Sequence, residues 1–443
     1  MPGNQTVGVV GLGYVGSCIA ATVADRGLRV VGVDAAPDLV EELNHGYCRW
    51  PEQELQEPFF RAHQAGRLRV TTDYAALSAA DVVLIAVGTP VRDDGSLDDR
   101  QLRSACLSLR DHLRPGQLVL VKSTVPPGTT RNLVLPLLES GGLTAGADFG
   151  LAFTPERLAE GNALADLSDL PMVVGGLDAA SRDAASDFWR TALGVDVIPQ
   201  DSLEAAEITK LADNWWIDLN IALANELAKY CALFDVDVLD VIAAANSLTK
   251  GNGNVNILMP SVGVGGSCLT KDPLMVRQSA ADQGLLLETP GAGRRVNDGM
   301  PGYTARLILE DLASAGVDAR SARIAVLGLA FKNNTGDLRA TPARQVVADL
   351  VAAGADVRLH DPLVDANQAK DMFGIRPTVT VEEAAQDAHC LAILAYHREL
   401  ADVDFVNLPV AQRCLILDGR AYFPKPKIAE LGAAGYRYQG IGR

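Results

Sequence analysis

The sequence lacks long apolar runs. In its 443 residues no stretch approaches the roughly 18 uninterrupted apolar residues that a membrane-spanning helix requires. The opening residues, MPGNQTVGVVGLGYVG, also lack the basic segment and the long apolar segment of a secretory signal peptide. From these absences we expect a cytoplasmic protein with no membrane partner.

Paired cysteines are also missing. The cysteines are odd in number, widely scattered and free of any CxxC pair, which argues against a disulfide framework or a structural zinc site. They are Cys18, Cys48, Cys106, Cys231, Cys268, Cys390 and Cys414. The histidines show no paired spacing, so we expect no metal. A functional cysteine in this chain would act as a reduced thiol.

Basic residues are in deficit. The formal net charge is −16, whereas nucleic acids and anionic membranes both bind to basic surfaces. We therefore expect no nucleic-acid partner. A phosphate-bearing ligand would have to be held by backbone amides and a few well-placed Lys or Arg side chains.

The chain is too long for one ordinary core, and its pattern changes twice. Residues 6–15 and 29–34 read as strands around a helical pattern at 17–26, and further strand-like runs cover 80–87, 117–122 and 149–154. This alternation predicts a parallel, doubly wound α/β domain over residues 1–200.

A long Ala- and Leu-rich stretch, 203–245, follows and predicts one long helical segment. Strand-like and helical runs alternate again at 323–329, 342–353, 356–360, 390–395 and 414–418. We therefore predict a central helical domain over 201–315 and a second, smaller α/β domain over 316–443.

A dinucleotide-binding pattern opens the first domain. Gly11-Leu-Gly13-Tyr14-Val15-Gly16 follows a predicted strand and begins a predicted helix, and Asp34 ends the next strand. The glycines permit a tight turn and a close approach of a pyrophosphate, while Asp34 would accept hydrogen bonds from ribose hydroxyls. Because an acidic group repels a 2′-phosphate, the pattern favours NAD over NADP.

A cysteine follows a glycine-rich loop in Gly263-Val-Gly-Gly-Ser-Cys268-Leu-Thr-Lys271-Asp272. At a helix start, positions 268, 271 and 272 would share one face. The helix N-terminus and Lys271 would then lower the pKa of the thiol, as a nucleophilic cysteine needs. We expect Cys268 to be that nucleophile.

At these residues the chain resembles the UDP-glucose/GDP-mannose dehydrogenase family, and the resemblance covers nearly the whole sequence. The matching motifs are GLGYVG, Gly88-Thr-Pro90, Lys122-Ser-Thr124-Val-Pro126, Thr154-Pro-Glu156-Arg-Leu-Ala-Glu160-Gly161, Glu207-Ile-Thr-Lys210-Leu-Ala-Asp-Asn214, the cysteine loop, Gly328-Leu-Ala-Phe-Lys332 and Asp337-Leu-Arg339. The resemblance implies two Rossmann-like domains joined by a long helix that builds a homodimer or higher oligomer. It also implies four-electron oxidation of a nucleotide sugar with two NAD⁺.

The resemblance also assigns roles. Lys210 and Asn214 would stabilise oxyanions, Thr124 and Glu156 would hold the catalytic water, Asp272 would assist its activation, and Glu160 would support that region. The expected cofactor contacts are Gly11, Gly13, Tyr14, Val15, Gly16, Asp34, Thr89, Thr124, Lys271 and Arg339. The expected substrate contacts are Glu156, Leu158, Lys210, Asn214, Gly265 and Lys332.

The substrate is not fixed by these motifs. The stretch 253–260 lacks the arginine common in UDP-glucose enzymes, and the segment 47–54 departs from the usual Pro-Ile-x-Glu-Pro-Gly-Leu pattern. Residues 295–301 resemble the branch acting on UDP-N-acetylhexosamines, whereas Ser267–Lys271 resembles the UDP-glucose branch. The cysteine loop favours UDP- or TDP-glucose, with a UDP-N-acetylhexosamine as the alternative. A two-electron hydroxyacid dehydrogenase would have no use for Cys268, and an inactive nucleotide-sugar-binding module would not need the full catalytic set.

Overall fold

We describe the fold from a computed structural model that covers residues 5–50, 52, 54–251 and 253–443. Pro51 and Gln53 of the divergent segment 47–54, and Asn252 of the glycine-rich loop, lie outside the described residues. Within the described part, the chain folds into two compact units. The first comprises Met1–Asp213 and Met275–Leu285, and the second comprises Asn214–Leu274 and Leu286–Arg443.

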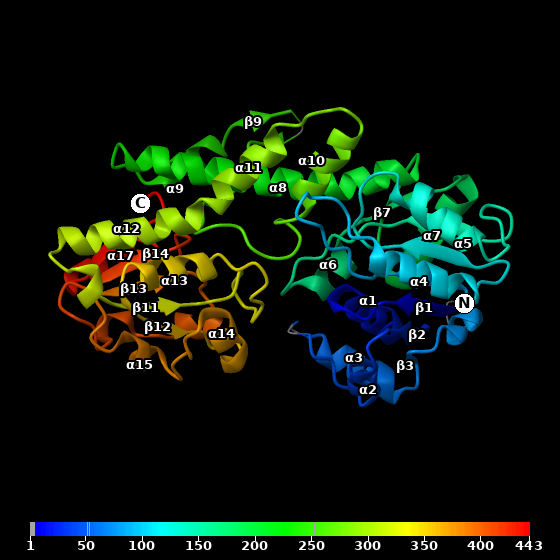
Figure 1. The fold of residues 1–443 in the computed structure, drawn as a ribbon, viewed down its shortest axis with the longest axis horizontal. Coiled ribbons are helices and arrows are strands. Elements are labelled where there is room, and N and C mark those ends of the chain that lie inside the picture. Colours follow the sequence, from blue (N-terminus) through cyan, green and yellow to red (C-terminus); the bar gives the residue numbers. More distant parts are fainter. Residues whose placement is uncertain (1–4, 51, 53, 252) are drawn as a thin grey trace. The chain divides into compact units, whose positions relative to one another are not determined.

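The first unit is built on one sheet with the strand order β3-β2-β1-β4-β5-β6-β7-β8 (Figure 1). Its strands are β1 (Thr6–Val10), β2 (Arg29–Val33), β3 (Leu68–Thr71), β4 (Val82–Ile85), β5 (Leu118–Val121), β6 (Gly150–Phe153), β7 (Met172–Gly176) and β8 (Val197–Gln200). The helices between them are α1 (Tyr14–Asp25), α2 (Pro37–Asn44), α3 (Gln56–Gln64), α4 (Arg100–Arg110), α5 (Leu135–Glu139), α6 (Ala163–Asp169) and α7 (Ala179–Leu193). The order from β3 to β6 is that of a dinucleotide-binding Rossmann sheet. The predicted parallel sheet is confirmed, with β6 and β7 as an antiparallel pair at its extension.

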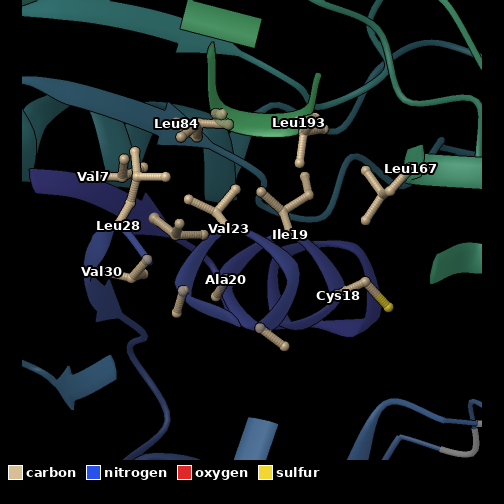
Figure 2. Packing of buried hydrophobic residues seen from close by; sticks show 14 of the residues in the cluster. Val7, Cys18, Ile19, Ala20, Val23, Leu28, Val30, Leu84, Leu167 and Leu193 are labelled. Atoms are coloured by element: carbon tan, nitrogen blue, oxygen red, sulfur yellow. The ribbon is translucent and has the colours of Figure 1, made fainter. Parts of the chain in front are cut away.

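The core of this unit forms where α1 packs on the sheet. Residues Gly16 to Ala24 of α1 are all buried, so the middle of this helix is covered on nearly every side. Figure 2 shows Val23 of α1 turned toward Val7 of β1 and Leu84 of β4, and Ile19 turned toward Leu193 of α7, all of them buried. This packing holds the start of α1, and with it the glycine loop, at the carboxyl end of β1.

The second unit contains a parallel sheet with the order β12-β11-β13-β14-β15, a doubly wound arrangement. Its strands are β11 (Arg323–Leu327), β12 (Asp356–His360), β13 (Cys390–Ile393), β14 (Leu415–Asp418) and β15 (Arg437–Gly440). The accompanying helices are α11 (Thr289–Asp298), α12 (Met300–Ser314), α13 (Ala343–Ala352), α14 (Ala366–Phe373), α15 (Val381–Ala385), α16 (Arg398–Ala401) and α17 (Lys425–Ala433). The predicted fold class, α/β with two Rossmann-like domains, is therefore confirmed.

The helical stretch predicted over 203–245 is two helices rather than one. The long helix α8 (Leu203–Ala232) ends before a turn, and α9 (Val238–Ala245) begins after it. Asp235 in this turn has φ 54°, and the Asp237 side chain caps α9 by accepting a hydrogen bond from the Leu239 amide. An aspartate can adopt a left-handed turn, so the break occurs without the glycine or proline that would mark it in the sequence.

The glycine-rich loop after α9 also contains structure that the sequence did not predict. Residues Thr249–Lys250 (β9) and Gly253–Asn254 (β10) form a short antiparallel hairpin. Helix α10 (Asp272–Asp282) follows the cysteine loop, and both α8 and α10 contribute residues to both units. None of the helices in the described part of the chain is both long and apolar enough to span a membrane.

Candidate active site

The glycine loop after β1 is a turn that tolerates no side chain at two of its positions. Gly11 has φ 88°, and a Cβ there would lie 2.8 Å from the carbonyl oxygen of Ala86. A Cβ on Gly16 would lie 1.9 Å from the Gly11 oxygen, so helix and strand approach too closely for any other residue. At Gly13, by contrast, a Cβ would meet nothing within 4 Å. The loop is thus tight toward the protein and open at its middle glycine.

The start of α1 and Asp34 complete a site that fits NAD. Among the described residues no side chain caps α1, so its first amide groups and its positive dipole end are available for a pyrophosphate. Asp34 Oδ2 accepts a hydrogen bond from the Leu12 amide at 2.7 Å, and Oδ1 accepts one from the Ala36 amide at 3.0 Å. These bonds fix the carboxylate beside the loop and leave acceptor capacity for ribose hydroxyls.

Tyr14 of the glycine loop is tied to a distant segment by Glu52. The Tyr14 hydroxyl donates a hydrogen bond to the Glu52 carboxylate, which also accepts from the amides of Gly161 (2.7 Å) and Ala163 (3.0 Å). Burial and the bond to Glu52 raise the pKa of Tyr14 well above its usual range. Glu52 thereby joins the dinucleotide loop to the segment that carries Glu160.

Three predicted residues follow neighbouring parallel strands of the first sheet. Thr89 follows β4, Thr124 follows β5 and Glu156 follows β6. Because the carboxyl ends of parallel strands meet at one edge, these residues belong to the edge where α/β proteins bind ligands. Glu156 is buried, and its Oε1 accepts a hydrogen bond from the Leu158 amide at 2.7 Å.

Lys122 lies behind Glu156 in the same unit. Its side chain is 1% exposed, and its Nζ lies 3.5 Å from Glu156 Oε2. The ammonium donates a hydrogen bond to the Pro155 oxygen at 3.1 Å and sits 4.8 Å from the ring centre of Trp189. Burial lowers the pKa of Lys122, and the nearby Glu156 carboxylate opposes this shift.

Helix α8 carries Lys210 and Asn214 one turn apart, both buried. One turn before Lys210, the fully buried Glu207 accepts hydrogen bonds from the amides of Gly128 (2.6 Å) and Thr130 (2.9 Å). Burial raises the pKa of Glu207 to about 7, although these hydrogen bonds act in the opposite direction. This contact links α8 to the loop that follows Thr124.

The second unit brings Asn214, Lys271 and Asp272 together. Asn214 Nδ2 donates a hydrogen bond to Asp272 Oδ2 at 2.5 Å, and Lys271 Nζ contacts Asp272 Oδ1 at 2.7 Å. The expectation that Cys268 begins a helix is wrong, because α10 starts at Asp272 and Cys268 lies in the preceding turn. The Cys268 carbonyl oxygen accepts hydrogen bonds from the Lys271 and Asp272 amides. The Cys268 side chain is exposed.

The glycines before Cys268 pack against the segment that carries Lys332 and Arg339. A Cβ on Gly265 would lie 2.6 Å from both Phe331 Cβ and the Ala340 oxygen, and the Gly266 amide donates to the Arg339 oxygen at 3.0 Å. Lys332 is half-buried. The exposed Arg339 guanidinium donates to the Asp337 carboxylate from both Nε and Nη2. The cysteine loop therefore packs on the segment 331–340, which carries both cations.

A buried polar network supports this loop from beneath. Arg294 contacts Asp218 at 2.7 Å and donates to the Leu269 oxygen at 3.4 Å. Asn297 donates to Asp218 at 2.8 Å and accepts a hydrogen bond from Asn225 at 2.9 Å. Burial raises the pKa of Asp218, and Arg294 opposes the shift. The network connects α8 and α11 to the residue that follows Cys268.

Family models match the chain in three consecutive parts. Residues 5–193 match the NAD-binding domain of the UDP-glucose/GDP-mannose dehydrogenase family, 204–299 its central domain and 325–425 its UDP-binding domain. The chain belongs to the UDP-glucose/GDP-mannose dehydrogenase family. It is accordingly an NAD-dependent nucleotide-sugar dehydrogenase, and the predicted cofactor, NAD, is confirmed.

Relatives in this family are similar over nearly the whole chain. UDP-N-acetyl-D-mannosamine dehydrogenase from Pyrococcus horikoshii is 31% identical, with 99% of both chains covered, and its structure superposes with a TM-score of 0.88. UDP-glucose 6-dehydrogenase from Haloferax volcanii is 33% identical, with 93% of this chain and 96% of the relative covered. A UDP-glucose dehydrogenase structure from Pyrobaculum islandicum is 31% identical and has a TM-score of 0.88, with 100% of this chain and 98% of that one covered.

The predicted site residues of this chain are divided between the two units. The first contains the NAD loop, Thr89, Thr124, Glu156, Leu158, Glu160 and Lys210; the second contains Asn214, Gly265, Cys268, Lys271, Asp272, Lys332 and Arg339. Lys122 and Glu207 stand within the matching motifs, but the motifs assign them no role, and nothing in the sequence pattern indicates Asp218 or Glu52. For Lys122 the available signal was a cation that ends the apolar run LVLV.

Proposed function

We propose that this chain oxidises the C6 alcohol of a UDP-N-acetylhexosamine to the carboxylate, with UDP-N-acetyl-D-mannosamine as the leading substrate. The observation that carries this proposal is the full-length similarity to the Pyrococcus horikoshii UDP-N-acetyl-D-mannosamine dehydrogenase. The resemblance of residues 295–301 to the hexosamine branch points the same way. The glucose preference that the cysteine loop suggested becomes the second candidate.

In this proposal the first oxidation removes the C6 hydroxyl proton and a hydride. NAD, when bound, supplies the hydride acceptor. Lys210 and Asn214 stabilise the oxyanion that develops at C6, because an ammonium and an amide N–H are both donors to negative oxygen. The bond from Asn214 to Asp272 fixes the amide so that a remaining N–H can serve this purpose.

The second oxidation passes through Cys268. Its thiolate attacks the C6 aldehyde to form a thiohemiacetal, and loss of a second hydride from C6 gives a thioester. Thr124 and Glu156 hold the water that hydrolyses the thioester, with Asp272 assisting its activation and Glu160 supporting the region. Covalent attachment keeps the aldehyde from escaping between the two oxidations.

The remaining assignments concern binding. Lys271 and Arg339 contact the cofactor phosphates, and Lys332 contacts the sugar nucleotide with Leu158 and Gly265 beside it, since both ligands are anionic and the chain is acidic. The match of 325–425 to a UDP-binding domain favours UDP over TDP. The matched ranges also support the domain division 1–200, 201–315 and 316–443.

A UDP-glucose substrate is the second candidate. Its support is the 33% identity to the Haloferax volcanii UDP-glucose 6-dehydrogenase and the TM-score of 0.88 with the Pyrobaculum islandicum structure. The two candidates share the C6 chemistry and differ at C2, where an acetamido group replaces a hydroxyl. Substrate comparison therefore separates them.

The test is NADH formation by the purified chain with NAD⁺ and each of UDP-N-acetylmannosamine, UDP-N-acetylglucosamine, UDP-glucose and TDP-glucose. We expect two NADH per sugar consumed, with the highest kcat/KM for UDP-N-acetylmannosamine. A higher kcat/KM for UDP-glucose would replace the leading substrate with the second candidate. One NADH per sugar would contradict the four-electron reaction itself.

A further inference from the structure

Lys122 is a buried cation for which the proposed steps give no use. It stands at the carboxyl end of β5, two residues before Thr124, with its side chain 1% exposed. Its ammonium lies 3.5 Å from Glu156 Oε2, donates to the Pro155 oxygen at 3.1 Å and lies 3.3 Å from the Met172 sulfur. Among the described residues no other cation lies within ion-pair distance of Glu156, so Lys122 is its counter-charge.

Burying the Lys122 ammonium costs folding free energy, so its position calls for a functional explanation. Moving an ammonium from water into a protein interior costs several kcal/mol, and replacing a buried ion pair with apolar groups of similar volume often stabilises a fold. The surroundings, Met172 and the ring of Trp189, would accept an apolar side chain as readily. The position of the ammonium beside Glu156 is therefore better explained by what it does to that carboxylate.

The two carboxylate oxygens of Glu156 have different surroundings. Oε1 accepts the Leu158 amide at 2.7 Å, whereas the buried Oε2 has no hydrogen-bond partner among the described residues and faces the Lys122 ammonium at 3.5 Å. A small cavity of about 10 Å³ lies between Lys122, Glu156, Leu158 and Met172. The Leu158 bond orients the carboxylate, and the ammonium behind it stabilises its negative charge.

We propose that Lys122 is a positioning residue for thioester hydrolysis: it holds the Glu156 carboxylate charged and oriented to accept a proton from the attacking water. This inference rests on the proposed function, in which Glu156 serves the thioester on Cys268. The water oxygen bonds to the thioester carbon, the carbon–sulfur bond breaks, and the Cys268 thiolate leaves. The proton released by water goes to Glu156, and no oxidation or reduction occurs in this step.

Because the two hydride transfers precede this step, loss of Lys122 should slow the steady state but not the first release of NADH. In Lys122→Met we expect the first turnover to release two NADH per active site at the unmodified rate. The following steady state should slow by on the order of 10- to 100-fold, as when a general base is impaired. The thioester should then accumulate on Cys268, where intact-protein mass spectrometry after acid quenching detects the added sugar-nucleotide acyl group.

The controls separate positioning from folding. Met172→Leu removes the sulfur that lies 3.3 Å from the ammonium but keeps both Lys122 and Glu156, so it should turn over like the unmodified chain. Lys122→Gln, which keeps a donor for the Pro155 oxygen, should accumulate the adduct as Lys122→Met does. Lys122→Met in a Glu156→Gln background removes both charges, and its kcat should equal that of Glu156→Gln alone, since coupled residues are not additive.

Two results would overturn the inference while leaving the proposed function intact. One is normal turnover of Lys122→Met without adduct, although Glu156→Gln traps the thioester. The other is a first-turnover burst that slows as much as the steady state, because that pattern means general damage. If the unmodified chain released one NADH per sugar, or if Glu156→Gln trapped no thioester, the proposed function would fail first and the Lys122 inference with it.

Discussion

At the scale of single residues, the proposed nucleophile Cys268 gives the most direct test of the proposed mechanism. It is exposed in a turn, with Ser267 Oγ 3.9 Å from its sulfur and α10 beginning only at Asp272. Cys268→Ser replaces the thiol with a far weaker nucleophile, so we expect uronic acid formation to fall by on the order of 1,000-fold, about 4 kcal/mol in the barrier. Quantifying acid and NADH per sugar checks this, with the buried Cys231→Ser as the matched control. Acid formation at the native rate in Cys268→Ser would rule out the covalent route.

At the scale of elements, α8 carries two glutamates about one turn apart, Glu204 and Glu207, whose pKa values shift in opposite directions. Burial raises the pKa of Glu207 to about 7, whereas the hydrogen bond from Arg131 lowers the pKa of Glu204. A carboxyl with a raised folded-state pKa stabilises the fold fully below its unfolded pKa and loses that contribution as pH rises through the folded value. Relative to Glu207→Gln, the unmodified chain should therefore lose on the order of 3 kcal/mol between pH 4.5 and 7.

Urea unfolding at several pH values, followed by tryptophan fluorescence, measures this difference. Glu204→Gln is the matched control: its folded-state pKa is lowered, so the contribution of Glu204 is complete above its unfolded pKa and is lost only in more acidic solution. The difference in the free energy of unfolding between Glu204→Gln and the unmodified chain should therefore stay constant between pH 5 and 8. A Glu207→Gln difference that is equally flat over this range would show that burial does not raise the pKa of Glu207.

Individual elements also show which parts of the fold and of the candidate site could be predicted from the sequence. The strands and helices around the glycine loop were predictable because their apolar spacing and glycines are local signals. The break between α8 and α9 was not, because Asp235 adopts a left-handed conformation without glycine or proline. The site motifs were predictable by resemblance, whereas the contacts of Lys122 with Glu156 and of Glu207 with Thr130 join residues 34 and 77 positions apart. No local pattern encodes such pairings.

At the scale of the whole molecule, we propose a homodimer built on α8. Trp216, Leu223 and Tyr230 are 49%, 52% and 60% exposed, and their spacing of seven residues places them along one face of the helix. Leu223 also lines a groove of about 550 Å³ between α8 and α11. An exposed apolar stripe on an otherwise acidic chain is the feature expected of a buried interface between copies.

Leu223→Asp places a charge in the middle of this stripe, where an interface would have to bury it without a partner, so we expect the variant to be monomeric. Leu286→Asp is the matched control: Leu286 is 80% exposed but lies outside α8, and the same substitution there should leave the dimer intact. Size-exclusion chromatography with light scattering gives the mass of each variant. A monomeric unmodified chain, or a Leu223→Asp variant that stays dimeric, would contradict an interface along α8. Because apolar burial rather than charge pairing holds such an interface, the dimer should persist at 0.5 M salt, where the Debye length falls to about 4 Å and surface ion pairs are largely screened.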